Sequence, residues 1–175
     1  MPHSFNKNKY SISRLDKTHQ RQKFSCGIEL LDDYLHKRAG QDDRRHVSIT
    51  YILNNIEQNQ VAGYYTLSST SIELMDLSDK LKSKLPQYPL LPATLIGRLA
   101  VDLNYQKQTL GEILLIDALK RSYQHTNEIA SIAVIVDAIN DNAIKFYEKY
   151  GFISVLSNRS KLYLPMESIG KLLVL

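Results

Sequence analysis

Several features that mark large classes of protein are missing from this chain of 175 residues. Its one cysteine, Cys26, cannot form an internal disulfide bond, which agrees with a reducing compartment. No segment approaches the roughly 20 consecutive apolar residues that a membrane-spanning helix needs, so we expect no membrane association. The first ten residues, MPHSFNKNKY, lack the apolar core of a signal peptide. We therefore expect a cytoplasmic protein.

Metal-binding patterns, linkers and internal repeats are also missing. The histidines are scattered, with no His-x-x-x-His spacing and no cysteine-rich motif, so we expect no metal site. Cys26 stands just before a predicted helix, but no histidine at an interpretable spacing supports a role as a nucleophile. Without a Gly/Ser linker, repeat or low-complexity tract, residues 1–175 are predicted to form a single domain with one core.

Charge is only slightly unbalanced. Lysine and arginine number 22 against 18 aspartates and glutamates, which gives a net charge of +4 and a pI near 9.0. That excess fits either an ordinary solvated surface or a surface that binds a polyanion. The basic residues Lys37, Arg38, Arg44 and Arg45 are clustered, and they are either a solvated helix end or a contact for an RNA backbone.

Hydrophobic periodicity predicts a mixed order of strands and helices. Strands are expected at 10–15, 46–53, 61–70, 93–102, 128–138 and 161–166, and helices at 28–41, 77–85, 110–124 and 142–151. Segment 93–138 forms a strand–helix–strand unit, and its right-handed crossover places the two strands in parallel. The chain is thus predicted to be an α/β or α+β domain with a mixed sheet.

A polar loop joins the strand at 93–102 to the helix at 110–124. The first backbone N–H groups of a helix are unpaired and its dipole favours anions, so this end can hold a phosphate. Lys107 adds a charge, and Gly111 permits close backbone approach. The loop nevertheless matches neither the P-loop nor the dinucleotide fingerprint. Both an anion site and an ordinary connection remain open on these residues alone.

Two side chains on predicted buried elements also have two interpretations each. Tyr147 lies on an apolar helical stripe, where it is either a packed side chain or a functional phenol. Arg98 is a charge on an otherwise apolar strand, so it needs either a structural ion pair or a ligand.

Two motifs, which follow one another along the chain, resemble motifs of the GNAT superfamily of N-acetyltransferases. The sequence QKQTLG at 106–111 resembles that family's acyl-CoA loop, normally Gln/Arg-x-x-Gly-x-Gly/Ala, and NDNAIKFYEKYGF at 140–152 resembles its Asn-x-x-Ala…Tyr-x-x-x-Gly-Phe block. Residues 24–45, 63–69 and 95–102 resemble the acetyltransferase toxins of bacterial toxin–antitoxin pairs. Thr109 departs from the family's usual glycine, and its Cβ would narrow the approach to the pyrophosphate.

The resemblance implies a GNAT fold, with a mixed and mostly antiparallel central sheet, a parallel splayed strand pair and helices on both faces. It also implies acetyl-CoA as co-substrate. The residues it assigns to acetyl-CoA, partly through backbone groups alone, are Leu99, Ala100, Val101, Gln106, Lys107, Gln108, Thr109, Leu110, Gly111, Asn140 and Phe146.

The resemblance further implies transfer of acetyl from acetyl-CoA to the α-amine of an aminoacyl-tRNA, which blocks translation. Tyr147 would protonate the departing thiolate, because a phenol with a pKa near 10 stays protonated at neutral pH. An α-amine with a pKa near 8 can attack directly, without an acyl-enzyme. The tRNA would contact Lys37, Arg38, Arg44, Arg45 and Arg98.

Partners follow from the same resemblance. We expect a ribbon-helix-helix antitoxin that covers the active site, with DNA bound only by the toxin–antitoxin complex, and a homodimer is a further option. Two alternatives stay open: an acetyltransferase that acts on a small-molecule or protein amine, and a non-catalytic binding module with a degraded CoA site.

Overall fold

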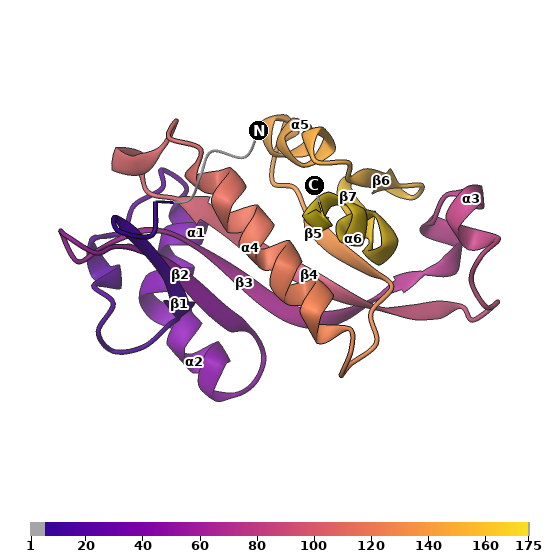
Figure 1. The fold of residues 1–175 in the computed structure, drawn as a ribbon, viewed down its shortest axis with the longest axis horizontal. Coiled ribbons are helices and arrows are strands. Elements are labelled where there is room, and N and C mark those ends of the chain that lie inside the picture. The colour runs from indigo at the N-terminus through magenta and orange to yellow at the C-terminus, as the bar shows by residue number, and fades with distance from the viewer. Residues whose placement is uncertain (1–5, 175) are drawn as a thin grey trace. The chain divides into compact units, whose positions relative to one another are not determined.

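The computed structural model describes residues 6–174 and contains, within them, a seven-stranded mixed sheet (Figure 1). Residues 1–5, part of the segment interpreted as lacking a signal peptide, and Leu175 lie outside the described residues. The hydrogen-bonded order of the strands is β1-β2-β3-β4-β5-β7-β6. The strands are β1 (Tyr10–Arg14), β2 (Ile49–Asn55), β3 (Gln60–Glu73), β4 (Leu90–Val101), β5 (Ala133–Asp137), β6 (Ile153–Val155) and β7 (Asn158–Pro165).

The helices are interspersed with the strands along the chain, and α6 follows the last strand. They are α1 (Glu29–Asp33), α2 (Ala39–Arg44), α3 (Asp79–Lys82), α4 (Leu110–His125), α5 (Asp141–Lys149) and α6 (Met166–Val174), with a π-helical turn η2 (Tyr34–Arg38) between α1 and α2 and short 3₁₀ turns elsewhere. The predicted mixed α/β class is confirmed. None of the helices within residues 6–174 is long and apolar enough to cross a membrane.

The residues group into two compact units, each built from two stretches of chain. Among the described residues, the first unit consists of those up to Ser68 together with Gly97–Ala118, and the second consists of Ser69–Ile96 with those from Leu119 on. Strands β3 and β4 and helix α4 contribute residues to both units. The predicted single domain stays a prediction.

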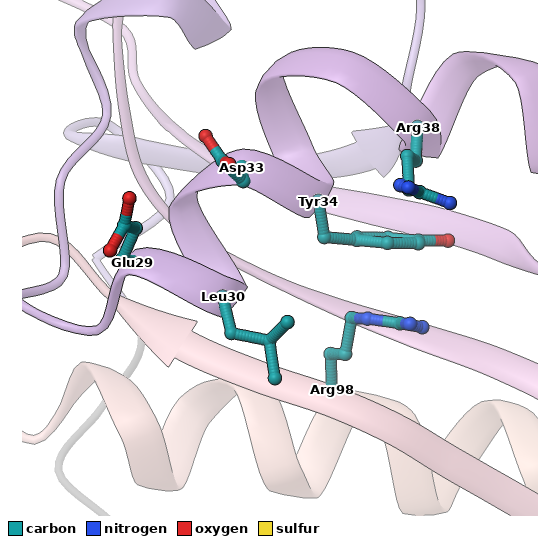
Figure 2. Close-up of a pocket in the computed structure, with 6 residues that line it drawn as sticks. All are labelled: Glu29, Leu30, Asp33, Tyr34, Arg38 and Arg98. Carbon is teal, nitrogen blue, oxygen red and sulfur yellow. The ribbon is translucent and has the colours of Figure 1, made fainter.

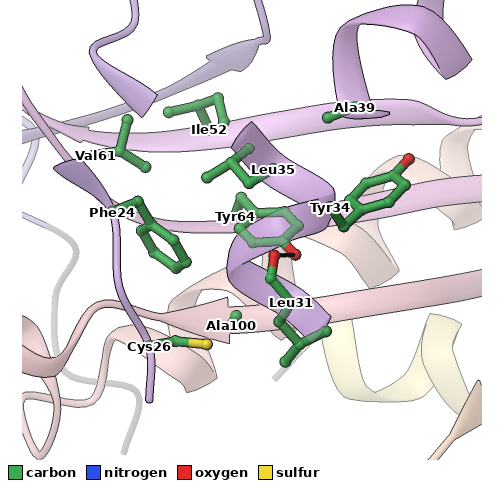
Figure 3. Close-up of a cluster of buried hydrophobic side chains, with 10 residues drawn as sticks. All are labelled: Phe24, Cys26, Leu31, Tyr34, Leu35, Ala39, Ile52, Val61, Tyr64 and Ala100. Atoms are coloured by element: carbon green, nitrogen blue, oxygen red, sulfur yellow. Dashed lines mark hydrogen bonds between the residues drawn. The ribbon is translucent and has the colours of Figure 1, made fainter. Parts of the chain in front are cut away.

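In the first unit, strands β1, β2 and β3 pair in antiparallel fashion, with Tyr51 opposite Tyr65 and Ile52 opposite Tyr64. The buried cluster in Figure 3 lies on one face of these strands, where Leu31 and Leu35 of the helical run pack with Tyr64. The Tyr64 hydroxyl donates to the Leu31 carbonyl oxygen at 2.7 Å, so this buried phenol has a partner.

Helix α4 covers the opposite face of β3 in this unit. Successive residues of a strand point to opposite faces, and a Cβ on Gly63 would lie 2.8 Å from Leu114 Cδ1 of α4. The next residue on that face, Tyr65, donates its hydroxyl to Asp117 of α4 at 2.6 Å. Helices on both faces of the sheet, as predicted, are therefore confirmed in the first unit.

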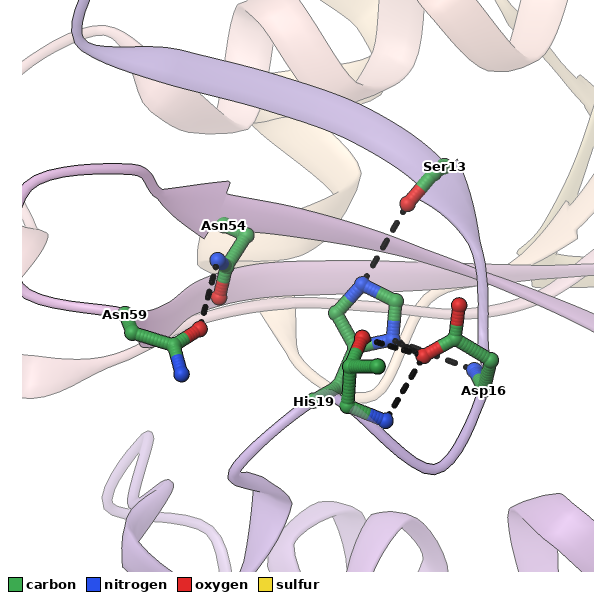
Figure 4. A network of polar contacts seen from close by, with 6 residues as sticks. Ser13, Asp16, His19, Asn54 and Asn59 are labelled. Carbon is green, nitrogen blue, oxygen red and sulfur yellow. Dashed lines mark hydrogen bonds and ion pairs between the residues drawn. The ribbon is translucent and has the colours of Figure 1, made fainter.

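A turn after β1 is fixed by polar contacts (Figure 4). The Asp16 carboxylate accepts hydrogen bonds from the backbone N–H and the hydroxyl of Thr18, which lower its pKa. His19 lies between Asp16 and Ser13, with its Nε2 3.2 Å from the serine hydroxyl. These contacts direct the chain from the edge strand toward the first helix.

In the second unit, Thr94–Ile96 of β4 pair in parallel with Val134–Val136 of β5, which confirms the predicted parallel pair. Strand β7 is antiparallel to both β5 and β6. The core of this unit contains Leu77 and Tyr163, and the Tyr163 hydroxyl accepts from the Ser78 backbone N–H at 3.0 Å.

The predicted elements differ from the structure in several places, among them helix α6, which was not predicted. The strand expected at 128–138 begins only at Ala133, because residues near 128 and 129 close a turn on the His125 carbonyl oxygen. The three-residue strand β6 was not predicted. The helix expected at 28–41 instead contains the π-helical turn η2 and continues to Arg44.

Candidate active site

The loop between β4 and α4 belongs to the first unit and is tied down by its own side chains. Gln106 donates from Nε2 to two carbonyl oxygens, that of Cys26 at 3.1 Å and that of Val101 at 3.0 Å. Gln108 reaches the Asn104 carbonyl oxygen at 3.4 Å. Both glutamine side chains thus shape the loop, and its backbone N–H groups and Lys107 are left as the groups suited to an anion.

Asp102 anchors the start of this loop. Its side chain is buried, and its two carboxylate oxygens accept from the backbone N–H groups of Ser25 and Asn104, each at 2.9 Å. Hydrogen bonds to a charged acceptor are stronger than neutral ones. Sequence reasoning missed this role, since an aspartate at a strand end has no distinctive spacing.

Two non-glycine residues of the loop adopt left-handed backbone angles. Lys107 has φ of 60° and Thr109 has φ of 63°, and such a conformation is an outlier for a β-branched residue. Thr109 therefore keeps the conformation that a glycine adopts easily, and its hydroxyl donates to the Gln108 carbonyl oxygen at 2.6 Å. Thr109, which stands where the family usually has glycine, therefore occupies a strained position of the loop.

Thr109→Gly is expected to bind acetyl-CoA more tightly, by about two- to tenfold, because removing Cβ opens the approach to the backbone N–H groups. Relief of left-handed strain, worth about 1–2 kcal/mol, is partly offset by glycine's greater entropy in the unfolded chain. Calorimetric titration with acetyl-CoA measures the affinity. Thr109→Ala is the control, since it retains Cβ and should resemble the wild type; weaker binding by the glycine variant contradicts the argument.

Tyr147 belongs to helix α5 of the second unit. Its side chain is 7% exposed and its ring packs edge-on against Phe146 and near Phe152, with centroids at 5.2 and 5.3 Å. Burial raises the pKa of its phenol above the ordinary value. No hydrogen bond of this hydroxyl exists in the described part of the chain. Because its pKa is raised, the phenol is protonated at neutral pH.

The other predicted residues of this unit have structural contacts. Asn140 is the N-cap of α5, and its Oδ1 accepts from the Ala143 backbone N–H at 2.9 Å. Phe146 is half-buried between the rings of Tyr147 and Tyr150. Gly151, just after this helix, has φ of 88°, a left-handed conformation that glycine adopts easily at a helix end.

Arg98 has a partner that the sequence did not reveal. Its guanidinium carbon lies 3.5 Å from the ring centroid of Tyr34, a cation–π contact, and the structure described for residues 6–174 gives it no carboxylate. Within that range the contact shown for Arg98 is thus a ring and not an ion pair (Figure 2), and the assignment of Arg98 to a ligand stays a prediction. The Tyr34 ring in turn is stacked on Tyr64 and donates its hydroxyl to Asp42 at 3.0 Å.

The π-helical turn η2 explains why Tyr34 can reach Asp42. Eight residues separate them, which is about 2.2 turns of an α-helix at 3.6 residues per turn. A π-helical turn has an i→i+5 hydrogen-bonding pattern and takes up the extra residue, so the two side chains come to the same side of the helical run. Burial raises the pKa of Tyr34, and the bond to Asp42 adds to this effect.

The basic residues near α2 differ in whether they form ion pairs. Lys37 pairs with Asp33 at 2.8 Å, whereas Arg38, Arg44 and Arg45 are exposed. The acids beside them are engaged elsewhere, because Asp43 pairs with Arg14 at 2.6 Å and Asp42 accepts from Tyr34. The three arginines therefore present positive charge that these neighbouring carboxylates do not neutralise.

Cys26 and the other side chains that could bind a metal ion have the following surroundings. Burial, with the nearby Asp32 carboxylate, raises the pKa of the Cys26 thiol to about 12, so it is not a thiolate at neutral pH. Residues 6–174 hold no group of three or more His, Cys, Asp or Glu side chains that could bind a metal ion.

Comparison with known proteins identifies the class of this protein. The model of a protein family described as "Acetyltransferase (GNAT) domain" matches residues 92–167 of this chain. Over 129 residues, 74% of this chain and 75% of the relative, the sequence is 35% identical to a tRNA-acetylating toxin of Mycobacterium tuberculosis. The chain therefore belongs to the GNAT acetyltransferases, in the branch of the tRNA-acetylating toxins. A probable toxin TacT of Sinorhizobium fredii is 26% identical, with 89% of this chain and 90% of that protein covered.

Solved structures agree with this assignment. AtaT in complex with acetyl-methionyl-tRNAfMet has a TM-score of 0.87 and 31% identity, covering 94% of this chain and 99% of that one. AtaTR bound with acetyl-CoA has a TM-score of 0.82 and 32% identity, covering 95% and 99%. The AtaT–AtaR complex bound to DNA has a TM-score of 0.75 and 29% identity, covering 93% and 99%.

Proposed function

We propose that this protein is a toxin that transfers acetyl from acetyl-CoA to the α-amine of an aminoacyl-tRNA. The observation that carries the proposal is the similarity, over almost the whole chain, to AtaT in complex with acetyl-methionyl-tRNAfMet. The similarity to a tRNA-acetylating toxin supports the same reaction. An acetylated amine cannot form a peptide bond, so the reaction blocks translation.

The co-substrate site is assigned to groups already described. The backbone N–H groups at 106–111 and the charge of Lys107 would hold the pyrophosphate, because the start of α4 favours an anion. The backbone of Leu99, Ala100 and Val101 would bind the pantetheine arm and the thioester carbonyl. Asn140 and Phe146 would contribute mainly by fixing the start of α5 and the ring of Tyr147. The structural relative AtaTR bound with acetyl-CoA supports this ligand.

The chemistry needs one proton donor and no covalent intermediate on the enzyme. The neutral α-amine attacks the thioester carbonyl carbon, a C–N bond forms, and the C–S bond breaks. Tyr147 donates its phenolic proton to the leaving sulfur and is reprotonated from the amine nitrogen through solvent. Because burial raises the pKa of this phenol, it is protonated at neutral pH and carries the proton that the leaving thiolate takes up.

The tRNA contacts are assigned to the basic residues of the first unit. Arg44 and Arg45 are exposed at the end of α2, and Lys37 and Arg38 precede that helix in the same helical run, so these residues could contact a phosphate backbone. Arg98 would act closer to the acceptor end.

We infer the partners and the location of the protein from the same similarities. An antitoxin of the ribbon-helix-helix type would cover the active site, and DNA would be bound by the complex, as the AtaT–AtaR structure with DNA supports. The protein would act in the cytoplasm, with a homodimer as one arrangement.

Labelled acetyl-CoA and total charged tRNA provide the test. We expect label on aminoacyl-tRNA and none on deacylated tRNA, together with growth arrest on expression without the antitoxin. Label only on free small amines indicates the alternative acetyltransferase, and binding of partners without any transfer indicates a non-catalytic module.

The pH profile tests the assigned proton donor. We expect kcat/KM to rise with pH through the acceptor amine's pKa near 8 and then to level off. A raised pKa extends the protonated form of Tyr147 to higher pH, so no descending limb should occur up to about pH 10, the ordinary phenol value. The acceptor for these measurements is an RNA that carries its amino acid through an amide bond, because the ester bond of an aminoacyl-tRNA is hydrolysed at high pH. A descending limb below pH 9 contradicts the assignment.

A further inference from the structure

A pocket of about 450 Å³ opens where the polar loop after β4 meets the turn between β2 and β3, within the first unit. Its volume is in the range of small-ligand sites. All the described residues that line it are polar: five carry an amide, one a phenol, one an ammonium group and one a carboxylate. Of the residues assigned above to acetyl-CoA or to tRNA, Gln108 alone is among them. The pocket therefore suits a second, polar ligand.

Tyr105, in the 3₁₀ turn η4 (Leu103–Tyr105), joins the two sides of this pocket. Its side chain is 7% exposed, and its hydroxyl lies 2.6 Å from Gln58 Oε1 and 3.1 Å from Gln60 Oε1. Burial raises the pKa of this phenol, so it keeps its proton at neutral pH. A hydroxyl has one hydrogen, which can satisfy only one of the two oxygens. The other oxygen keeps its capacity to accept from a ligand with N–H groups.

Hydrogen bonds fix the walls of the pocket before any ligand binds. Asn55 is buried, and its Oδ1 accepts from the Gln58 backbone N–H at 3.1 Å while its Nδ2 donates to the Tyr105 hydroxyl at 3.3 Å. The Ile56 backbone N–H donates to the Lys9 carbonyl oxygen at 2.9 Å, which ties the residue before β1 to the same turn. A preformed site loses little entropy when its ligand binds.

Two opposite charges line the pocket. Lys9 stands just before β1, Glu57 lies in the turn between β2 and β3, and both side chains are exposed. In the part of the chain that the structure describes, neither forms an ion pair, and the Lys9 Nζ lies 5.4 Å from the ring centroid of Tyr10. Such a pair of charges attracts a ligand that carries both signs, and it repels one that carries the same sign twice.

We propose that this pocket binds a free polar amino acid as its zwitterion, with the carboxylate on Lys9 and the ammonium group on Glu57 and Gln60. An ammonium group has three N–H donors, which match the surplus of acceptor oxygens. The polar side chain of the ligand would lie against the amides of Asn104 and Gln108. A residue within a peptide lacks both charges, and one at the end of a peptide lacks one of them, so the charge pattern selects a free amino acid.

The bound amino acid would stabilise the polar loop, because Asn104 and Gln108 belong to it. Lys107 and Thr109 have left-handed backbone angles in this loop, and such angles persist only where the surrounding contacts enforce them. The effect on acetyl-CoA rests on the proposed function, which assigns the pyrophosphate to the same loop. By thermodynamic linkage, the amino acid and acetyl-CoA should strengthen each other's binding by the same factor.

Calorimetric titration of the full-length protein with three probes tests the charge pattern. The probes are L-glutamine, L-glutaminamide, which lacks the carboxylate, and 4-carbamoylbutanoate, which lacks the ammonium group. At about pH 6, where the amines are protonated, L-glutamine should bind with a dissociation constant at least about tenfold lower than either of the others, because each of these loses one charge-assisted contact. Binding of L-glutamine that is no tighter than that of the other two probes overturns the proposal.

Charge variants test the assigned residues. Glu57→Gln and Lys9→Gln should each raise the dissociation constant of L-glutamine at least about tenfold. Lys9→Gln should leave the affinity for L-glutaminamide nearly unchanged, since that probe has no carboxylate, and a general distortion of the pocket would not produce this difference. Lys7→Gln is the matched control, because Lys7 is also exposed but does not line the pocket. Equal affinities of the wild type and both charge variants for L-glutamine overturn the proposal.

A separate titration tests the effect on acetyl-CoA. A concentration of L-glutamine that saturates the wild type should lower its dissociation constant for acetyl-CoA about fivefold or more, and the same concentration should have little effect in Glu57→Gln. An unchanged affinity of the wild type for acetyl-CoA overturns the coupling. If no aminoacyl-tRNA is acetylated, the proposed function fails, whereas the titrations with L-glutamine still decide whether the pocket binds an amino acid.

Discussion

Tyr147→Phe is expected to lower kcat for acetyl transfer by about 100- to 10,000-fold, the usual contribution of a positioned general acid. The phenylalanine ring keeps the contacts with Phe146 and Phe152, so the core around it should be preserved. What is lost is the proton for the leaving thiolate. Single-turnover rates with aminoacyl-tRNA measure this effect, and calorimetric titration should show acetyl-CoA binding within about twofold of the wild type.

Tyr150→Phe is the matched control on the same helix. Tyr150 also has its ring against Phe146, but its side chain is only half-buried, and no role in proton transfer is assigned to it. It should retain nearly full activity. Full activity in Tyr147→Phe, or an equal loss in both variants, would remove Tyr147 from the mechanism.

Asp102→Ala should lower the free energy of unfolding by about 2–4 kcal/mol, because two backbone N–H groups lose a charged acceptor in a buried place. Those groups belong to Ser25 and Asn104, so the variant should also loosen the start of the polar loop and weaken acetyl-CoA binding. Urea unfolding measures the first effect, and titration with acetyl-CoA measures the second. The two losses are expected together.

Asp141→Ala provides the comparison for Asp102. Asp141 has an exposed side chain, 3.7 Å from Arg159, and exposed ion pairs contribute about 0–1 kcal/mol. Its removal should therefore change stability little. A stability of Asp102→Ala equal to that of Asp141→Ala would show that the two backbone bonds do not anchor the loop.

Local patterns in the sequence predict much of this molecule. The run of apolar residues before the polar loop and the apolar helix after it identify β4 and α4, and Gly151 identifies the end of the α5 region. These features depend on neighbouring residues, which is why they can be read from one chain. The parallel pairing of β4 and β5 follows from the handedness of the crossover between them.

Other features depend on tertiary contacts and could not be predicted. Arg98 needed a partner, but nothing in the sequence identifies Tyr34 as the ring on which it stacks. The buried acceptor role of Asp102 depends on a segment that comes much earlier in the chain. Strand β6 is too short for an alternating pattern to be recognised, and it forms because β7 offers it a hydrogen-bonding edge.

The π-helical turn η2 makes this region tolerant of a change in chain length. Because the turn takes up one extra residue, removing one residue from Tyr34–Arg38 would restore ordinary α-helix and leave the residues after it in nearly the same orientation. Tyr34 and Asp42 would then be seven residues apart, close to two turns of an α-helix, and would stay on the same side. A homologue one residue shorter here would therefore keep Arg44 and Arg45 on the side where they lie now.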